Sequence, residues 1–132
     1  MKTKYGIRGF ETRSHIESCK AELQVVDQII TQLARALIEF GEPLNLAGSP
    51  VRLKIVYLLH LEEELCVSDF GDILVMNSGT VYNHLCKLKD GRLIQLNPIN
   101  NRIFYSLTEE FQTLFAPFFE ILDYKNGLEE VL

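Results

Sequence analysis

The chain has 132 residues, 47% of them hydrophobic, and a formal net charge of −5. This length is enough for one domain with its own core, and no apolar run is long enough to span a bilayer. The first residues also lack the apolar segment of a signal peptide, so we expect a cytoplasmic protein without a membrane partner. Three scattered cysteines, at positions 19, 66 and 86, indicate reduced thiols and not a disulfide framework.

The charges are unevenly distributed along the chain. Residues 1–14 and 77–106 each hold four Lys or Arg and one acidic residue, a net charge of +3 in each, which leaves −11 for the remainder. Affinity for nucleic acid depends on where cations meet phosphates, so two basic segments are compatible with DNA binding despite the acidic total. A solvated surface with a chance asymmetry is the alternative.

Residues 1–43 are predicted to form a flexible basic arm (1–11) and a dimerisation helix (12–43). Between residues 12 and 40 there is no Gly or Pro, and Gly41-Glu42-Pro43 is a stop signal. Apolar residues in this segment recur at alternating spacings of three and four, which is typical of a helix that pairs with another helix. A second copy of the chain is the simplest partner. A core helix within one chain is the alternative. The apolar positions are Ile16, Cys19, Leu23, Val26, Ile30, Leu33, Leu37 and Phe40.

Residues 44–76 predict a short connection, two helices and a short strand. Ser49-Pro50 has the residue types favoured where a helix begins. After the acidic residues 62–64, Leu65-Cys66-Val67 is apolar and can pair as a third strand with a later hairpin. Ser68 is expected to cap a helix over 69–74, and residues 75–77 then form a turn.

Residues 77–91 predict a helix with one buried stripe and one polar face. Asn77 is a favoured N-cap, and Val81, Leu85 and Leu88 repeat at spacings of four and three. Gly91 is expected to end the helix in a left-handed conformation. Off the stripe lie side chains that suit contacts in a DNA groove: Ser78, Gly79, Thr80, Tyr82, Asn83, His84 and Lys87.

Residues 93–107 predict a β-hairpin, with strands over 93–96 and 102–106 around a turn at 97–101. Arg102 adds a cation that can meet DNA. Two helices joined by a turn and followed by a β wing are typical of a winged helix-turn-helix, whose second helix enters the major groove. The sequence therefore predicts a mainly α fold with a small β wing and double-stranded DNA as a partner.

Residues 108–125 predict a second dimerisation helix, followed by a frayed tail at 126–132. The sequence Ser106-Leu107-Thr108-Glu109 fits the capping box, with Ser106 as the cap, and Pro117 predicts a kink. The many Phe residues need a partner, which we expect to be the first helix of the same or the other subunit. The predicted molecule is one domain, a homodimer through its first and last helices.

Four segments resemble the ArsR-type (SmtB/ArsR-like) metalloregulatory repressors. Residues 46–56 resemble their "L-x-D-P-T-R-L-x-I-L", 64–70 their "E-L-C-V-x-D-L", 79–85 their "S-T-V-S-x-H-L", and 102–107 their "R-x-x-Y-Y-x-L". The resemblance covers residues 44–107 and implies a homodimeric winged-helix repressor that leaves its operator when an effector binds. Val75 stands where relatives often have a turn glycine, and the wing tip lacks their usual Lys or Arg.

The effector is not identified by the sequence. One metal site of the family uses a C-x-C pair; this chain has Cys66 in the first place but Ser68 in the second. A second site of the family uses His and acidic residues on the last helix, and no His or Cys follows Ser106 in this chain. His15 and Cys19, one helical turn apart, together with Cys66 have donor types that suit a soft metal ion such as zinc. Oxidation of the thiols is another possible signal, and plain packing of small apolar side chains is the alternative.

An enzyme and a protein-binding module are the alternatives to a DNA-binding regulator. The chain has no Gly-rich phosphate loop, no G-x-S-x-G and no H-E-x-x-H, so we expect no enzymatic activity. A winged-helix module that binds protein in place of DNA is the stronger rival, because of the acidic total and the uncharged wing tip. A regulator that has lost metal sensing is a further alternative.

Overall fold

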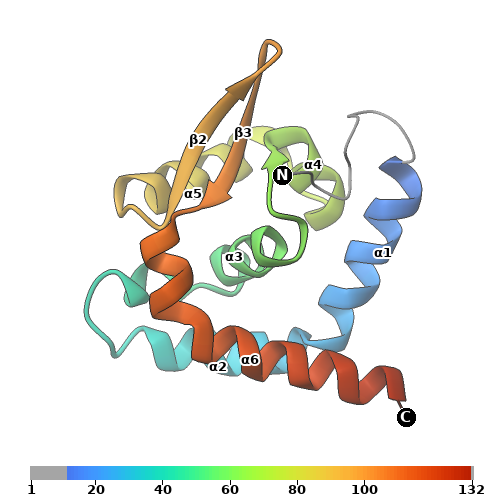
Figure 1. Cartoon of the computed structure of the whole chain (residues 1–132), viewed down its shortest axis with the longest axis vertical. Coiled ribbons are helices and arrows are strands. Elements are labelled where there is room, and N and C mark those ends of the chain that lie inside the picture. Colours follow the sequence, from blue (N-terminus) through green and yellow to red (C-terminus); the bar gives the residue numbers. More distant parts are fainter. Residues whose placement is uncertain (1–11, 132) are drawn as a thin grey trace.

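The computed structural model describes residues 12–131, with side chains described for 14–124, so the predicted arm (1–11) lies outside the described residues. The elements are α1 (Thr12–Val25), α2 (Asp27–Leu37), the 3-10 helix η1 (Leu44–Ala47), α3 (Pro50–Glu62), β1 (Leu65–Cys66), α4 (Val67–Leu74), α5 (Ser78–Asp90), β2 (Ile94–Ile99), β3 (Arg102–Leu107) and α6 (Glu109–Val131) (Figure 1). The predicted fold class, mainly α with a small β wing, is confirmed. Among the described helices we find no candidate for crossing a bilayer.

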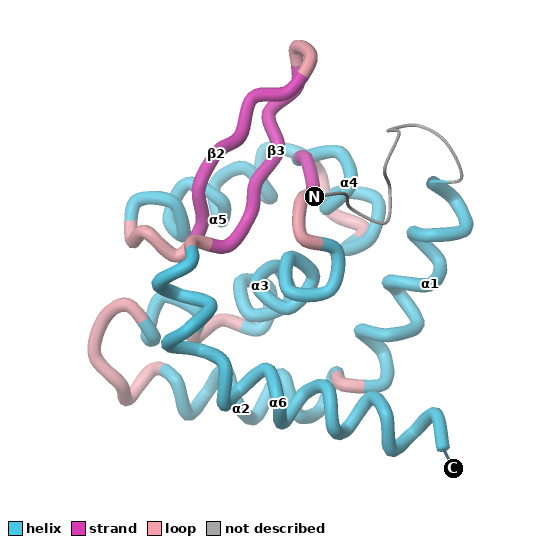
Figure 2. The backbone as a smooth tube through the Cα atoms, in the orientation of Figure 1, coloured by secondary structure: helices cyan, strands magenta, loops and turns pink. Residues whose placement is uncertain are grey.

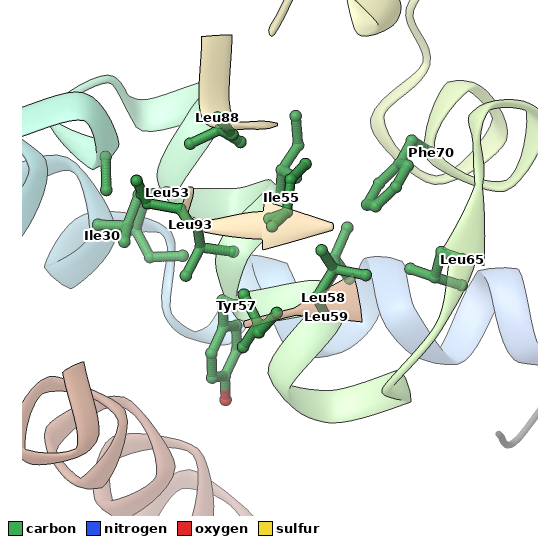
Figure 3. Packing of buried hydrophobic residues seen from close by; sticks show 14 of the residues in the cluster. Ile30, Leu53, Ile55, Tyr57, Leu58, Leu59, Leu65, Phe70, Leu88 and Leu93 are labelled. Atoms are coloured by element: carbon green, nitrogen blue, oxygen red, sulfur yellow. The ribbon is translucent and has the colours of Figure 1, made fainter. Parts of the chain in front are cut away.

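Helix α3 lies at the centre of the fold and is buried on most of its circumference. It begins as predicted, because the Ser49 hydroxyl oxygen accepts a hydrogen bond from the Arg52 backbone N–H at 3.3 Å. Figure 3 shows its buried side chains beside Ile30 of α2, Phe70 of α4 and Leu88 of α5. These contacts bring the helices that surround α3 into one hydrophobic core.

The three strands form one antiparallel sheet in the order β1-β3-β2. The predicted third strand is present, with Leu65 opposite Tyr105. The hairpin turn is shorter than predicted: only Asn100 and Asn101 form it, with φ of 48° and 67°, the left-handed values that a two-residue type I′ turn requires. The hairpin projects beyond the helices (Figure 2).

The prediction of one long helix over the N-terminal segment is wrong. The helix is interrupted at Val26, and α1 and α2 run in different directions in Figure 1. The break allows α1 to pack on α4 while α2 packs on α3. Most of the predicted seam, five of its eight positions, is buried within the same chain, as the alternative of an intramolecular helix requires: Cys19, Leu23, Val26, Ile30 and Leu37.

Three predicted helix boundaries also need correction. Helix α4 begins at Val67 with Cys66 as its cap, so Ser68 lies inside the first turn. Helix α6 is capped by Thr108 and not by Ser106, since the Thr108 hydroxyl oxygen accepts from the Phe111 backbone N–H at 3.2 Å. It continues to Val131 through the segment predicted to fray. It contains Pro117, and its change of direction in Figure 1 confirms the predicted kink.

Candidate nucleic-acid interface

Helix α5 is fixed on its inner side and exposed on its outer side. Val81, Leu85 and Leu88 are fully buried, which confirms the predicted stripe. The Asn77 side-chain oxygen accepts a hydrogen bond from the Thr80 backbone N–H at 2.8 Å, as expected of an N-cap. In the turn before α5, Val75 adopts φ 56° and ψ 56°, a left-handed conformation that suits glycine.

The structure places the predicted DNA-binding residues on one exposed helix face and on the hairpin. Arg102 begins β3 beside the hairpin turn, and the other seven residues belong to α5. Neither Lys87 nor Arg102 forms an ion pair with any residue that the structure describes, so both cations are available to phosphates. Ser78, Gly79, Tyr82, Asn83, Lys87 and Arg102 are exposed, whereas Thr80 and His84 are partly exposed.

Two hydroxyl groups at the junction of α5 and the wing remain protonated at neutral pH. A hydrogen bond with the Cys86 thiol raises the pKa of Tyr82 above 10.0, and Cys86 is only partly buried. Burial raises the pKa of Tyr105, with further contributions from Tyr82 and Cys86. A phenol is already neutral at pH 7 at its ordinary pKa of about 10, so these upward shifts leave both side chains uncharged.

Arg52 lies near this face and was not among the predicted DNA-binding residues. It belongs to α3, and its guanidinium Nη1 lies 3.3 Å from Nδ1 of His84. Burial, Arg52 and Lys87 lower the pKa of His84 below 6.5. In the sequence, Arg52 lies close to the predicted start of a helix. No pattern in the sequence indicates its contact with His84, which follows 32 positions later.

The predicted metal ligands are not brought together as a set. Cys19 is 1% exposed, and its ligand atom lies within 4.8 Å of those of Glu22 and Glu62, the one such cluster among the described residues. The Cys19 thiol lies 3.6 Å from Oε2 of Glu62. His15 is outside this cluster, and Cys66 instead contacts the carboxylate of Asp69 at 3.2 Å. Neither Glu22 nor Glu62 was predicted as a ligand. Glu62 stands in an acidic run, which is typical of an exposed surface and not of a metal site.

The helix-turn-helix and the projecting hairpin together define a winged helix-turn-helix protein. Residues 49–95 match the family described as bacterial regulatory protein, arsR family. The chain is 37% identical over 59 residues to a cadmium resistance transcriptional regulatory protein CadC homolog from Staphylococcus aureus, covering 45% of this chain and 49% of the relative. It is 35% identical over 72 residues to the transcriptional repressor PagR from Bacillus anthracis, covering 54% of this chain and 72% of PagR.

Solved structures agree with these matches. The crystal structure of PagR superposes with a TM-score of 0.52 at 30% identity, covering 57% of this chain and 86% of PagR. The transcriptional regulator HlyU from Vibrio vulnificus shares the fold at 19% identity, with a TM-score of 0.53 over 83% of this chain and 96% of HlyU.

The chain belongs to the arsR family of bacterial regulatory proteins, which confirms the resemblance seen in the sequence. It is a transcriptional regulator, and the prediction that it is not an enzyme is confirmed by the same matches. The match spans about half the length of the CadC homolog.

Proposed function

We propose that this chain is a homodimeric repressor that acts in the cytoplasm, binds an operator in double-stranded DNA through α5 and the wing, and is released by an effector. The observation that carries the proposal is the exposed polar face of α5, whose opposite side is fully buried. A helix anchored in this way presents hydrogen-bonding groups to a major groove without unfolding any of the core. Lys87 of α5 and Arg102 of β3, which form no ion pair with a described residue, supply cations for the phosphates.

A second copy of the chain is supported by an apolar stripe on α6 that its own core covers only in part. Leu114 and Ile121 are exposed, and Phe118 between them is partly exposed, at spacings of four and three. Phe40, which follows α2 and is also exposed, contacts Phe118 with tilted rings whose centroids lie 6.3 Å apart. Exposed apolar side chains gathered on one helix face favour association, and two copies would place two α5 helices on successive turns of DNA.

A salt titration of binding to a duplex tests the DNA proposal. A duplex is selected from a random pool, and its affinity is measured by fluorescence anisotropy over a range of salt concentrations. Groove binding predicts that the logarithm of affinity falls linearly with the logarithm of salt, by about 0.9 for each phosphate contact. Absence of any salt-sensitive binding would reject the proposal.

A protein partner for the wing is a second candidate. Leu96, Ile99 and Ile103 are exposed on the hairpin, and its turn carries two uncharged Asn residues. Such a surface also suits an apolar protein contact. The same titration separates the two candidates, because a protein-binding module has no reason to bind duplex DNA in proportion to its phosphate contacts.

The effector that we propose is a soft metal ion or a thiol-directed signal at Cys19. Thiolate and carboxylate donors both bind zinc, so the cluster with Glu22 and Glu62 fits such an ion, and the predicted set with His15 and Cys66 stays a prediction. Zinc titration of the reduced protein distinguishes the two sets. Loss of zinc binding in Glu62→Gln but not in Cys66→Ser supports the cluster. Loss in Cys66→Ser but not in Glu62→Gln supports the predicted set. Absence of zinc binding in the unchanged protein rejects a metal effector of this kind.

A further inference from the structure

Arg52 of α3 connects its own helix with η1 and with α5. Its Nε donates a hydrogen bond to the Leu46 carbonyl oxygen of η1 at 2.7 Å, while Nη1 lies 3.3 Å from Nδ1 of His84 in α5. Its own backbone N–H is held by Ser49 at the start of α3. Arg52 is therefore held at its backbone and at its guanidinium group, which in turn contacts the ring of His84.

This contact allows one arrangement of protons on the ring. Guanidinium nitrogens donate hydrogen bonds and cannot accept them, so Nδ1 of His84 must accept. The proton of the neutral ring is then on Nε2. Nε2 has no hydrogen-bond partner among the described residues and is not one of their buried unsatisfied atoms, so it is reachable from solvent.

The charges around the ring favour the neutral form. Partial burial of the ring lowers the pKa of His84 most, and the cations Arg52 of α3 and Lys87 of α5 lower it further. No carboxylate among the described residues pairs with it. His84 also shares a helix face with Thr80 and Lys87, at spacings of four and three, within the surface proposed to meet DNA.

We infer that Arg52 is a positioning residue for DNA recognition, which holds His84 as a neutral ring whose Nε2–H donates to a hydrogen-bond acceptor on DNA. The inference rests on the proposed function, binding of DNA by α5. In the major groove, guanine, adenine and thymine offer acceptors, whereas the exposed edge of cytosine offers a donor. A base contact therefore predicts discrimination against cytosine on the contacted strand.

Nitrogen-15 NMR of the histidine rings tests the positioning step without DNA. We expect a protonated Nε2 and an unprotonated Nδ1 in His84, with a pKa below 6.5, and a higher pKa in Arg52→Met. The His84→Gln variant assigns the signal. A proton on Nδ1 in the neutral ring, or an unchanged pKa in folded Arg52→Met, would overturn the role of Arg52.

Binding to DNA tests the donor. His84→Ala is expected to lose about tenfold in affinity for a selected duplex, the effect of one hydrogen bond, whereas His84→Gln, whose amide nitrogen retains a donor, should lose much less. Loss confined to the selected sequence identifies a base acceptor, and equal loss on an unrelated duplex identifies a phosphate.

Full affinity of His84→Ala on both duplexes would overturn the donor role. If the unchanged protein binds no DNA at all, the proposed function and the DNA contact fail together, while the NMR measurement still decides whether Arg52 controls the ring.

Discussion

Val75 ends α4 in a conformation that suits glycine. Its φ of 56° and ψ of 56° are left-handed, and its side chain is 76% exposed, so it gains little from packing. A β-branched residue in this region costs about 1–2 kcal/mol. The valine at this position is therefore accommodated by backbone strain.

Replacing Val75 by Gly should stabilise the protein. We expect the free energy of unfolding to rise by about 1 kcal/mol, less than the full strain because glycine also gains freedom in the unfolded chain. Urea denaturation measures the change. The control is Ala36→Gly at an exposed position of α2, which should lower stability by about 0.5–1 kcal/mol. A Val75→Gly protein less stable than the original would show that the valine side chain contributes packing.

Gly91 illustrates a residue whose importance was predicted for the wrong reason. Its φ is −84°, and Arg92 adopts the left-handed value of 67° in its place. A Cβ at position 91 would clash with Cδ1 of Leu46, the end of a flexible side chain, so glycine allows η1 to pack closely on the end of α5. That packing matters for the site, because Leu46 also accepts the hydrogen bond of Arg52.

The Gly91→Ala variant should lose stability by about 1–3 kcal/mol through overpacking. Gly79→Ala is the matched control within the same helix, since its nearest atom would be 3.5 Å away, and it should gain up to about 1 kcal/mol from helix propensity. Thermal or urea unfolding compares the two. Addition of Leu46→Ala to Gly91→Ala should restore part of the loss, and simple additivity of the two changes would contradict the proposed clash.

At the scale of elements, α5 and the wing should contribute differently to DNA binding. Lys87→Ala and Arg102→Ala should each weaken binding to all duplexes alike. Each should also reduce the slope of log affinity against log salt concentration by about 0.9, because it removes one cation proposed to meet a phosphate. Asn83→Ala or Thr80→Ala should lower discrimination between sequences at nearly constant slope. Lys54→Ala is the control, since Lys54 of α3 pairs with Asp27 at 3.1 Å. An unchanged slope in Lys87→Ala would reject the proposed docking.

How far each element could be predicted depends on whether its signal is local. The stripe of α5 and its Asn77 cap follow from neighbouring residues, and each is confirmed. The break at Val26 has no local signal, since no Gly or Pro stands there, and it arises because α1 and α2 pack on different elements.

The same distinction applies to the candidate site. The exposed face of α5 was predictable because helical spacing separates it from the buried stripe. The contact of Arg52 with His84, and the proximity of Glu62 to Cys19, join residues 32 and 43 positions apart, and only the tertiary structure reveals them.

At the scale of the whole molecule, α6 carries two apolar stripes, one buried and one largely exposed. Phe111, Phe115 and Leu122 are buried in the core of the same chain. Leu114 and Ile121 lie outside that core and are exposed. One stripe is thus accounted for within the protomer, and the proposed dimer accounts for the other.

A charge on the outer stripe should separate the subunits. We expect Ile121→Glu to shift the molar mass measured by light scattering from dimer to monomer, because a carboxylate buried in an apolar interface would lose its hydration without a partner. Ile103→Glu on the wing is the matched control: Ile103 is 42% exposed and Ile121 48%, but the wing is not part of the proposed dimer contact.

DNA binding should weaken together with the dimer. A monomer engages a single half-site, so Ile121→Glu should lower affinity for a selected two-half-site duplex much more than for a single half-site. If the unchanged protein is itself a monomer, or if Ile121→Glu remains a dimer, the outer stripe of α6 is not the interface. Equal loss of affinity for both duplexes would indicate damage to α5 itself and would contradict the coupling of the dimer to the operator.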